Sequence, residues 1–180
     1  MFPHALIPSV ALSLLAVGCA HARTVADASS LPVAQAALVN ASGGAVGIAT
    51  LYQEAGGVRV ELSLTGLSDG AHGVHLHAVG ACDGPAFTSA GAHINSSGAM
   101  HGVKNSAGPH AGDLPNVIMN GGQSVRYTTT TRRVTLSDAA DGLFDANGSA
   151  IVVHADADND RTDPAGNSGA RIACGVITRR

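Results

Sequence analysis

Apolar and polar residues alternate with a period of two along much of the chain from Val33 onward. The clearest case is VRVELSLT at residues 58–65, in which valines and leucines alternate with Arg, Glu, Ser and Thr. Such alternation predicts a β-strand with one buried side and one solvent-facing side. Similar short runs are AQAALVN, AVGIATLYQ, GVHLHAV, VRYTTTTRR, AIVVHA and ARIACGVIT.

Turns rich in Gly, Asp and Asn separate these runs, and no long amphipathic helix is predicted between them. Several short strands of this kind predict an all-β antiparallel barrel or sandwich. The 180 residues suit a single domain with a core of its own. With 45% hydrophobic residues, 13% charged residues and a net charge of -3, the chain matches neither a disordered protein nor a nucleic-acid binder.

The alternation stops between Val79 and Asn116, in a segment rich in Gly, Ser, His and Pro. This segment is far longer than the usual connection in a compact domain, so we expect something other than a core to hold it. A second irregular stretch, ADADNDRTDPAGNSGA, follows His154.

The first 22 residues predict an export signal, because their apolar centre is shorter than the roughly 20 residues that a membrane-spanning helix needs. Two ends of this signal fit the sequence. LAVGC, ending at Cys19, resembles a bacterial lipobox, whereas AHA, ending at Ala22, suits ordinary signal-peptidase cleavage. Residues 23–32 are then a tether, and the folded domain occupies residues 33–180.

The chain has three cysteines, and an exported domain normally pairs its thiols. If Cys19 carries lipid, Cys82 and Cys174 are left and can form a bridge without an exposed free thiol. If cleavage follows Ala22 instead, Cys19 is discarded with the signal. Either reading predicts a periplasmic protein, anchored to a membrane in the first case.

The histidines beyond the signal have a spacing that indicates metal binding. Side chains two apart share one face of a strand, so His75 and His77 in HGVHLH can reach one ion, whereas His72 faces elsewhere. The long loop adds three histidines and an aspartate, a donor set that fits the tetrahedral preference of zinc. These residues are His93, His101, His110 and Asp113.

With these motifs in place, the sequence resembles the bacterial exported copper/zinc superoxide dismutases. The resemblance rests on GVHLH, AGAHINSSGAMHG, GPHAGDLPN, IVVHADADN and GNSGARIACGVI, which agree with the family in order and spacing. It implies a flattened, eight-stranded Greek-key β-barrel with two long loops, related in architecture to the immunoglobulin sandwich. It also implies dismutation of superoxide to dioxygen and hydrogen peroxide, with a redox-active copper and a structural zinc.

The same resemblance implies the metal ligands. Copper would be bound by His75, His77, His93 and His154. Zinc would be bound by His93, His101, His110 and Asp113. His93 would therefore bridge the two metals and also supply a proton during turnover.

Other roles follow from the resemblance in the same way. Arg171 would hydrogen-bond the anionic substrate beside the copper. Asp158 would accept hydrogen bonds from ligand imidazoles, and His72 would give structural support. Cys82 and Cys174 would form the intrasubunit disulfide.

The resemblance allows two oligomeric states, because relatives occur as monomers and as homodimers. The loop after His154 carries four aspartates against Arg161, where many relatives have lysines that attract superoxide, and Lys104 is expected to compensate in part. The alternative function is a non-catalytic copper/zinc-binding or copper-delivery module on the same barrel. Such relatives usually lack copper ligands or the arginine, which this chain keeps.

Overall fold

The structure is a computed structural model that describes residues 32–139 and 142–180. Its strands are β1 Pro32–Asn40, β2 Ala45–Glu54, β3 Gly57–Leu64, β4 Gly70–His77, β5 Asp113–Met119, β6 Val125–Thr131, β7 Ala150–His154, β8 Arg171–Val176 and β9 Thr178–Arg179. Within these residues the helical structure is one 3-10 turn, η1 Thr88–Ala90. The predicted all-β fold class is confirmed.

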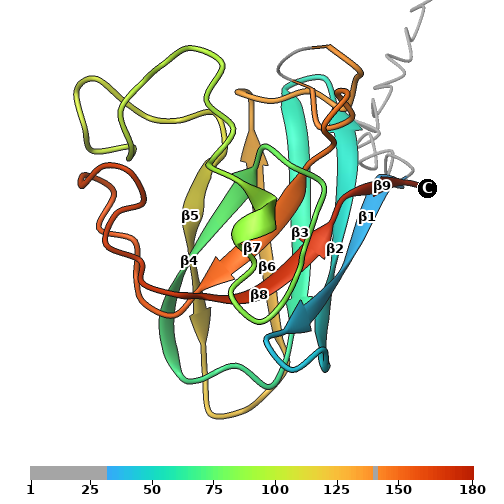
Figure 1. Cartoon of the computed structure of the whole chain (residues 1–180), viewed down its shortest axis with the longest axis vertical. Coiled ribbons are helices and arrows are strands. Elements are labelled where there is room, and N and C mark those ends of the chain that lie inside the picture. Colours follow the sequence, from blue (N-terminus) through green and yellow to red (C-terminus); the bar gives the residue numbers. More distant parts are fainter. Residues whose placement is uncertain (1–31, 140–141) are drawn as a thin grey trace, which may run out of the picture.

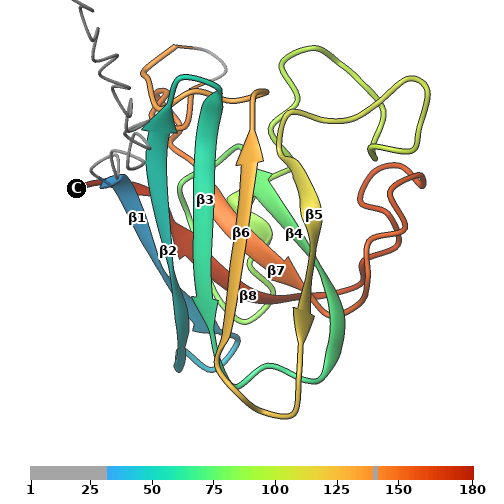
Figure 2. The same cartoon turned by 180° about the vertical axis from the view of Figure 1, so that it is seen from behind.

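Eight strands form one sheet in the order β5-β4-β7-β8-β1-β2-β3-β6, and the short β9 pairs with β1. The end strands β5 and β6 follow each other in the chain and lie next to each other, so the sheet curls into a nearly closed barrel (Figures 1 and 2). Apolar side chains fill the interior. The alternation seen in β3 is confirmed, because every second residue from Val58 to Leu64 is buried.

Strand β5 was not predicted from the sequence. The irregular segment was expected to extend to Asn116, but β5 begins inside it, at Asp113. Pro115 weakens the strand pattern, because proline cannot donate a hydrogen bond to a neighbouring strand. It is tolerated here because β5 is an end strand of the sheet.

The predicted export signal and all but the last residue of the predicted tether lie outside the described residues. The structure begins with Pro32, which is already part of β1. Within residues 32–139 and 142–180, no helix has the length and apolar character needed to cross a membrane.

Two long loops, residues 78–112 and 155–170, connect these strands. The first part of loop 78–112 passes with η1 over β7 and β8, and its later part lies beside loop 155–170 at one edge of the barrel (Figures 1 and 2). The main-chain N–H of Lys104 donates to the carbonyl of Asp160 at 2.9 Å. Gly102 makes this approach possible, because a Cβ at its position would overlap the backbone of Asp160. The two loops therefore support each other through backbone contacts.

The predicted disulfide between Cys82 and Cys174 is confirmed, and it ties the first loop to β8. It spans 92 residues, so loop closure in the unfolded chain corresponds to about 4–5 kcal/mol of stability. Phe87 packs beside it, with 1% of its surface exposed, in a small apolar cluster that includes Cys174 and Val152. The front half of the loop thus has a core of its own.

Candidate metal centre

The first group of potential ligands is built on β4 and β7. Leu76 points into the barrel core, so its neighbours His75 and His77 point outward beneath the loops. The isolated bridge between His77 and His93 brings the loop histidine beside the strand. His154 ends β7, which pairs directly with β4. One nitrogen from each of four buried histidines lies within 4.8 Å of the others: His75, His77, His93 and His154.

The outer ring nitrogens of two histidines in this group bond to backbone carbonyls. His77 Nδ1 lies 2.9 Å from the oxygen of Gly91, and His154 Nδ1 lies 3.2 Å from that of Gly169. A carbonyl accepts only, so each Nδ1 carries the proton and each Nε2 has a free lone pair. Both Nε2 atoms are buried without a hydrogen-bond partner. Such orphaned nitrogens fit a metal ion that the protein alone does not supply.

The second group surrounds the carboxylate of Asp113. Its Oδ1 lies 2.9 Å from Nδ1 of His93, 3.0 Å from that of His101 and 3.4 Å from that of His110. The Nδ1 atoms of His93 and His110 are 3.3 Å apart. Neighbouring ligand atoms in a tetrahedral zinc site, with bonds of 2.0–2.1 Å, are roughly 3.3–3.4 Å apart. The set implied for zinc is therefore close to a zinc-sized arrangement.

Mutual distance alone gives a slightly different second set. One donor atom from each of His75, His93, His101 and Asp113 lies within 4.8 Å of the others, and His110 is outside this group. His75 thus lies between the two groups. Its Nε2 bonds to Asp158 at 2.8 Å, and its Nδ1 is buried without a partner.

His93 differs from the other ligand candidates. Its Nδ1 faces Asp113, but its Nε2 makes no hydrogen bond in the described part of the chain. Both ring nitrogens can therefore face a metal, which fits the bridging position that the resemblance implies for this residue.

Asp158 connects the two groups. Its carboxylate lies 2.8 Å from Nε2 of His75 and 2.9 Å from Nε2 of His101, one histidine from each group. Asn116, which the sequence did not single out, holds Asp158 in place through two hydrogen bonds of 2.8 Å to its backbone. Burial opposes the charge, but the bonds from His101 and His75 hold the pKa of Asp158 below its usual range.

Burial keeps three imidazoles of the first group neutral. It lowers the pKa of His77 to about 2, that of His154 to about 3 and that of His93 to about 4. His101 behaves differently, because it lies between two carboxylates. Burial opposes its charge, but Asp113 and Asp158 together raise the pKa of His101 to about 9.

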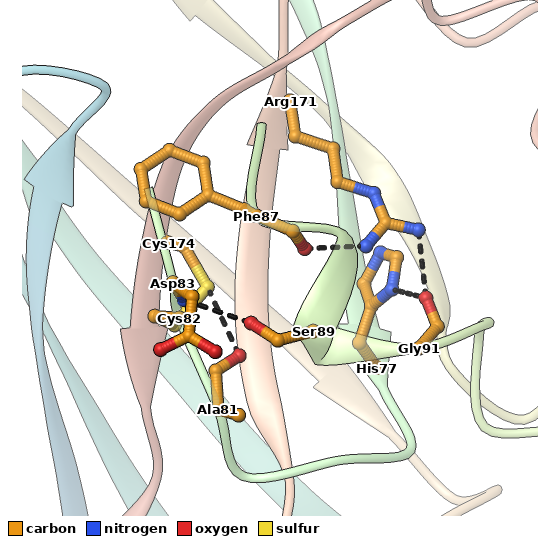
Figure 3. The surroundings of a disulfide bond; sticks show 9 residues. All are labelled: His77, Ala81, Cys82, Asp83, Phe87, Ser89, Gly91, Arg171 and Cys174. Atoms are coloured by element: carbon orange, nitrogen blue, oxygen red, sulfur yellow. Dashed lines mark hydrogen bonds between the residues drawn. A yellow bond between two sulfur atoms is a disulfide. The ribbon is translucent and has the colours of Figure 1, made fainter. Parts of the chain in front are cut away.

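Arg171 is fixed beside the first group by the front half of the loop 78–112, which the disulfide attaches to β8 (Figure 3). Its Nη1 donates to the carbonyl of Phe87 at 2.6 Å, and its Nη2 donates to that of Gly91 at 2.7 Å. The Gly91 carbonyl also accepts the bond from His77, so the guanidinium and this imidazole share one anchor. Phe87 adopts a left-handed backbone conformation, with φ 53°, which its buried ring stabilises.

A cavity of about 490 Å³ opens next to these groups and is lined by His93, His110, Asp163 and Arg171, among others. Arg171 is the one cationic side chain among its described lining residues. Lys104 was expected to add positive charge, but its Nζ pairs with Asp160 at 2.6 Å. The positive charge that faces this cavity is therefore mainly that of Arg171.

His72 belongs to neither group. Its Nδ1 lies 2.7 Å from the carbonyl of His154, and its Nε2 lies 2.9 Å from that of Ser68. These contacts connect the end of β7 to the chain before β4. The geometry agrees with a supporting role for this residue.

The chain is similar in sequence to several known proteins and to one family model. A family model described as copper/zinc superoxide dismutase matches residues 45–177. A protein of Aquifex aeolicus named Cu-Zn superoxide dismutase 2 is 42% identical over 146 residues, which cover 80% of this chain and 85% of that protein. A Cu-Zn superoxide dismutase of Caulobacter vibrioides is 40% identical over 134 residues, covering 73% and 77%.

Solved structures show the same similarity. A SOD-like protein from Bacillus subtilis is 36% identical, with a TM-score of 0.76, over 79% of this chain and 96% of that chain. The Cu/Zn superoxide dismutase from Brucella abortus is 27% identical, with a TM-score of 0.65, over 80% and 98%.

Substitution of Gly166 tests the position of the Asp158 carboxylate. A Cβ at this residue would overlap Asp158 and come within 2.8 Å of His101 Nε2, so we expect Gly166→Ala to displace the carboxylate. Metal affinity should fall at least about tenfold, as for other residues that orient ligands. Gly121→Ala is the matched control. The φ angle is +60° at Gly121 and +63° at Gly166, so both substitutions strain the backbone similarly, but a Cβ at Gly121 would meet nothing within 4 Å. Equal metal affinities in the two variants, measured by chelator competition, would contradict this prediction.

Zinc binding should depend more on pH than copper binding. The pKa of His101 is about 9 in the metal-free protein, so at pH 7 zinc must displace a proton from it. We expect release of about one proton and a zinc affinity that rises as pH increases from 7 to 9. His77 and His154, with pKa values of about 2 and 3, are already neutral and release none. Calorimetry at pH 7 and at pH 9, in two buffers of different ionisation enthalpy, measures the number of protons released and the zinc affinity. Equal proton release on binding of zinc and of copper would refute this prediction.

Proposed function

The chain belongs to the copper/zinc superoxide dismutase family, and from this premise we propose how its residues perform the reaction and where in the cell the protein works. The reaction converts two superoxide anions and two protons into dioxygen and hydrogen peroxide. The protein is thus an oxidoreductase, with copper and zinc as its cofactors.

We propose that each of the two histidine groups binds one of the two metals. Copper, when bound, supplies the one-electron redox couple that the reaction needs, whereas zinc has none. We assign copper to His75, His77, His93 and His154. We assign zinc to His93, His101, His110 and Asp113, on the basis of the distances around the Asp113 carboxylate.

Arg171 binds the anionic substrate. Two of its N–H groups are held by the carbonyls of Phe87 and Gly91, so the guanidinium is already oriented before superoxide arrives. Its remaining N–H donors are available to an oxygen of the substrate. Since its positive charge lines the cavity beside His93, the anion is drawn to the imidazoles from this side.

His93 handles a proton. Its Nε2 makes no hydrogen bond in the described residues, so this atom can take up a proton when it is not bound to metal. Burial lowers the pKa of His93 to about 4, so in the metal-free protein this ring is neutral at pH 7 and has a lone pair to offer to a metal. The peroxide formed in the reaction would accept this proton.

The observation that carries this proposal is the set of buried, unpartnered nitrogens beside an oriented guanidinium. His75 Nδ1, His77 Nε2 and His154 Nε2 are all orphaned, and each outer nitrogen is held by an acceptor. A protein that bound zinc only to stabilise its fold, without redox chemistry, would need neither these three histidines nor Arg171.

We further propose that the protein is exported to the periplasm and works there as a monomer or a homodimer. The apolar start of the chain supports export, and so does the disulfide, because disulfides persist in oxidising compartments. The lipobox-like LAVGC supports a lipid anchor at Cys19.

Replacement of Cys19 tests the anchor. In cells that express the full chain, we expect the wild-type protein in the membrane fraction and Cys19→Ser in the soluble periplasmic fraction, because the lipid of a lipobox is attached to the cysteine sulfur, which serine lacks. Wild-type protein that is entirely soluble would indicate cleavage after Ala22 instead.

His154→Ala tests the dismutase assignment. In protein loaded with both metals, the variant should lose copper and activity but keep most of its zinc, because His154 belongs only to the copper-side group. The measurements are metal content and superoxide decay on the same samples. Retained activity would refute the copper assignment.

Arg171→Ala is the companion variant. It should keep both metals and lose about tenfold or more in rate, which corresponds to one charge-assisted hydrogen bond to the substrate. Wild-type protein that binds one copper and one zinc but has negligible turnover would instead indicate a metal-binding or copper-delivery module.

A further inference from the structure

Asp163 lies in the loop 155–170, and its side chain reaches the other long loop. Its Oδ1 accepts a hydrogen bond of 2.7 Å from the main-chain N–H of His101. The same oxygen lies 3.6 Å from Nε2 of His110. Both partners belong to the proposed zinc ligands, called here the zinc-side group: His93, His101, His110 and Asp113. Asp163 lies more than 50 residues away from His101 and His110 in sequence.

The outer nitrogens of the zinc-side histidines show a common arrangement. His101 directs its Nε2 to the carboxylate of Asp158, and His110 directs its Nε2 toward that of Asp163. In both cases Nδ1 is the nitrogen that faces Asp113. One loop therefore presents a separate carboxylate to each of two histidines on the other loop.

We propose that Asp163 is a positioning residue for the zinc ligands, with a role distinct from that of Asp158. It holds the backbone of His101 in place and favours the tautomer of His110 that has its proton on Nε2 and its lone pair on Nδ1. His110 needs this support, because it is not among the residues whose donor atoms all lie within 4.8 Å of one another around Asp113. The proposal rests on the proposed function only in that zinc occupies this group.

The chemistry of the contact determines the expected effect. The carboxylate is 39% exposed, so its attraction to His110 across water is weak. The bond to the His101 N–H is short and charge-assisted, and it constrains a backbone that carries a ligand. Loss of residues that orient ligands typically weakens metal binding by about 10-fold to 100-fold, and we expect the lower end of this range.

Asp156 provides a matched control. It lies in the same loop, is exposed and carries the same charge, but its carboxylate makes no hydrogen bond within residues 32–139 and 142–180. If Asp163 acted only through its negative charge near the site, Asp156→Ala and Asp163→Ala would have similar effects.

The test measures zinc loss from copper-free, zinc-loaded protein to a chromophoric chelator. Asp163→Ala should lose zinc about tenfold faster than wild type, and Asp156→Ala less than twofold faster. Asp163→Asn keeps an oxygen that can accept the His101 N–H, so it should restore most of the lost zinc retention. Cobalt bound in place of zinc provides a second signal, because its visible spectrum should change in Asp163→Ala and not in Asp156→Ala.

Similar zinc loss in the two alanine variants, whether fast or slow, would overturn the proposal, and so would an asparagine variant no better than alanine. These measurements do not depend on dismutase activity. The role of Asp163 can therefore be tested even if the protein binds zinc but does not turn over superoxide. A wild-type chain that binds no zinc would refute the zinc assignment and this inference together.

Discussion

A neutral imidazole offers a lone pair to a metal only if its other nitrogen carries the proton, and much of this structure serves that requirement. On the copper side, the carbonyls of Gly91 and Gly169 accept the outer N–H groups of His77 and His154. Asp158 does the same for His75. Each of these histidines is left with a buried nitrogen that has no protein partner, and these nitrogens converge.

This requirement also explains how two loops with little apolar core keep one conformation. The loop 78–112 supplies ligands, and the loop 155–170 supplies the carboxylates that orient them, so neither loop is complete alone. Gly102 allows their backbones to touch, and the disulfide of Cys82 holds the front of the first loop to β8. The barrel provides a rigid base, because β4 and β7 are paired and buried.

The electrostatics differ from the pattern expected of many relatives. Lys104 is paired with Asp160, and Asp163 lines the same cavity as Arg171. Among the described residues that line this cavity, the guanidinium of Arg171 is therefore the one permanent positive charge. Its orientation depends on the carbonyls of Phe87 and Gly91, so the position of this charge is linked to the loop that the disulfide attaches to β8.

The sequence by itself determined the fold class and the ligand candidates. Period-two alternation identified β3 and most other strands, because a half-buried strand must alternate, and the spacing of His75 and His77 placed both on one face. The roles of His154, Asp158 and Arg171 came from resemblance to a known family, which also implied the cysteine pair that the count of thiols allowed. Strand β5 was missed, since its proline and its position at the end of the sheet obscure the pattern. Only the tertiary structure showed the roles of Asn116, Asp163 and the carbonyls of Gly91 and Gly169. Backbone acceptors have no residue-specific signal, and contacts between loops far apart in sequence exist only once the barrel brings them together.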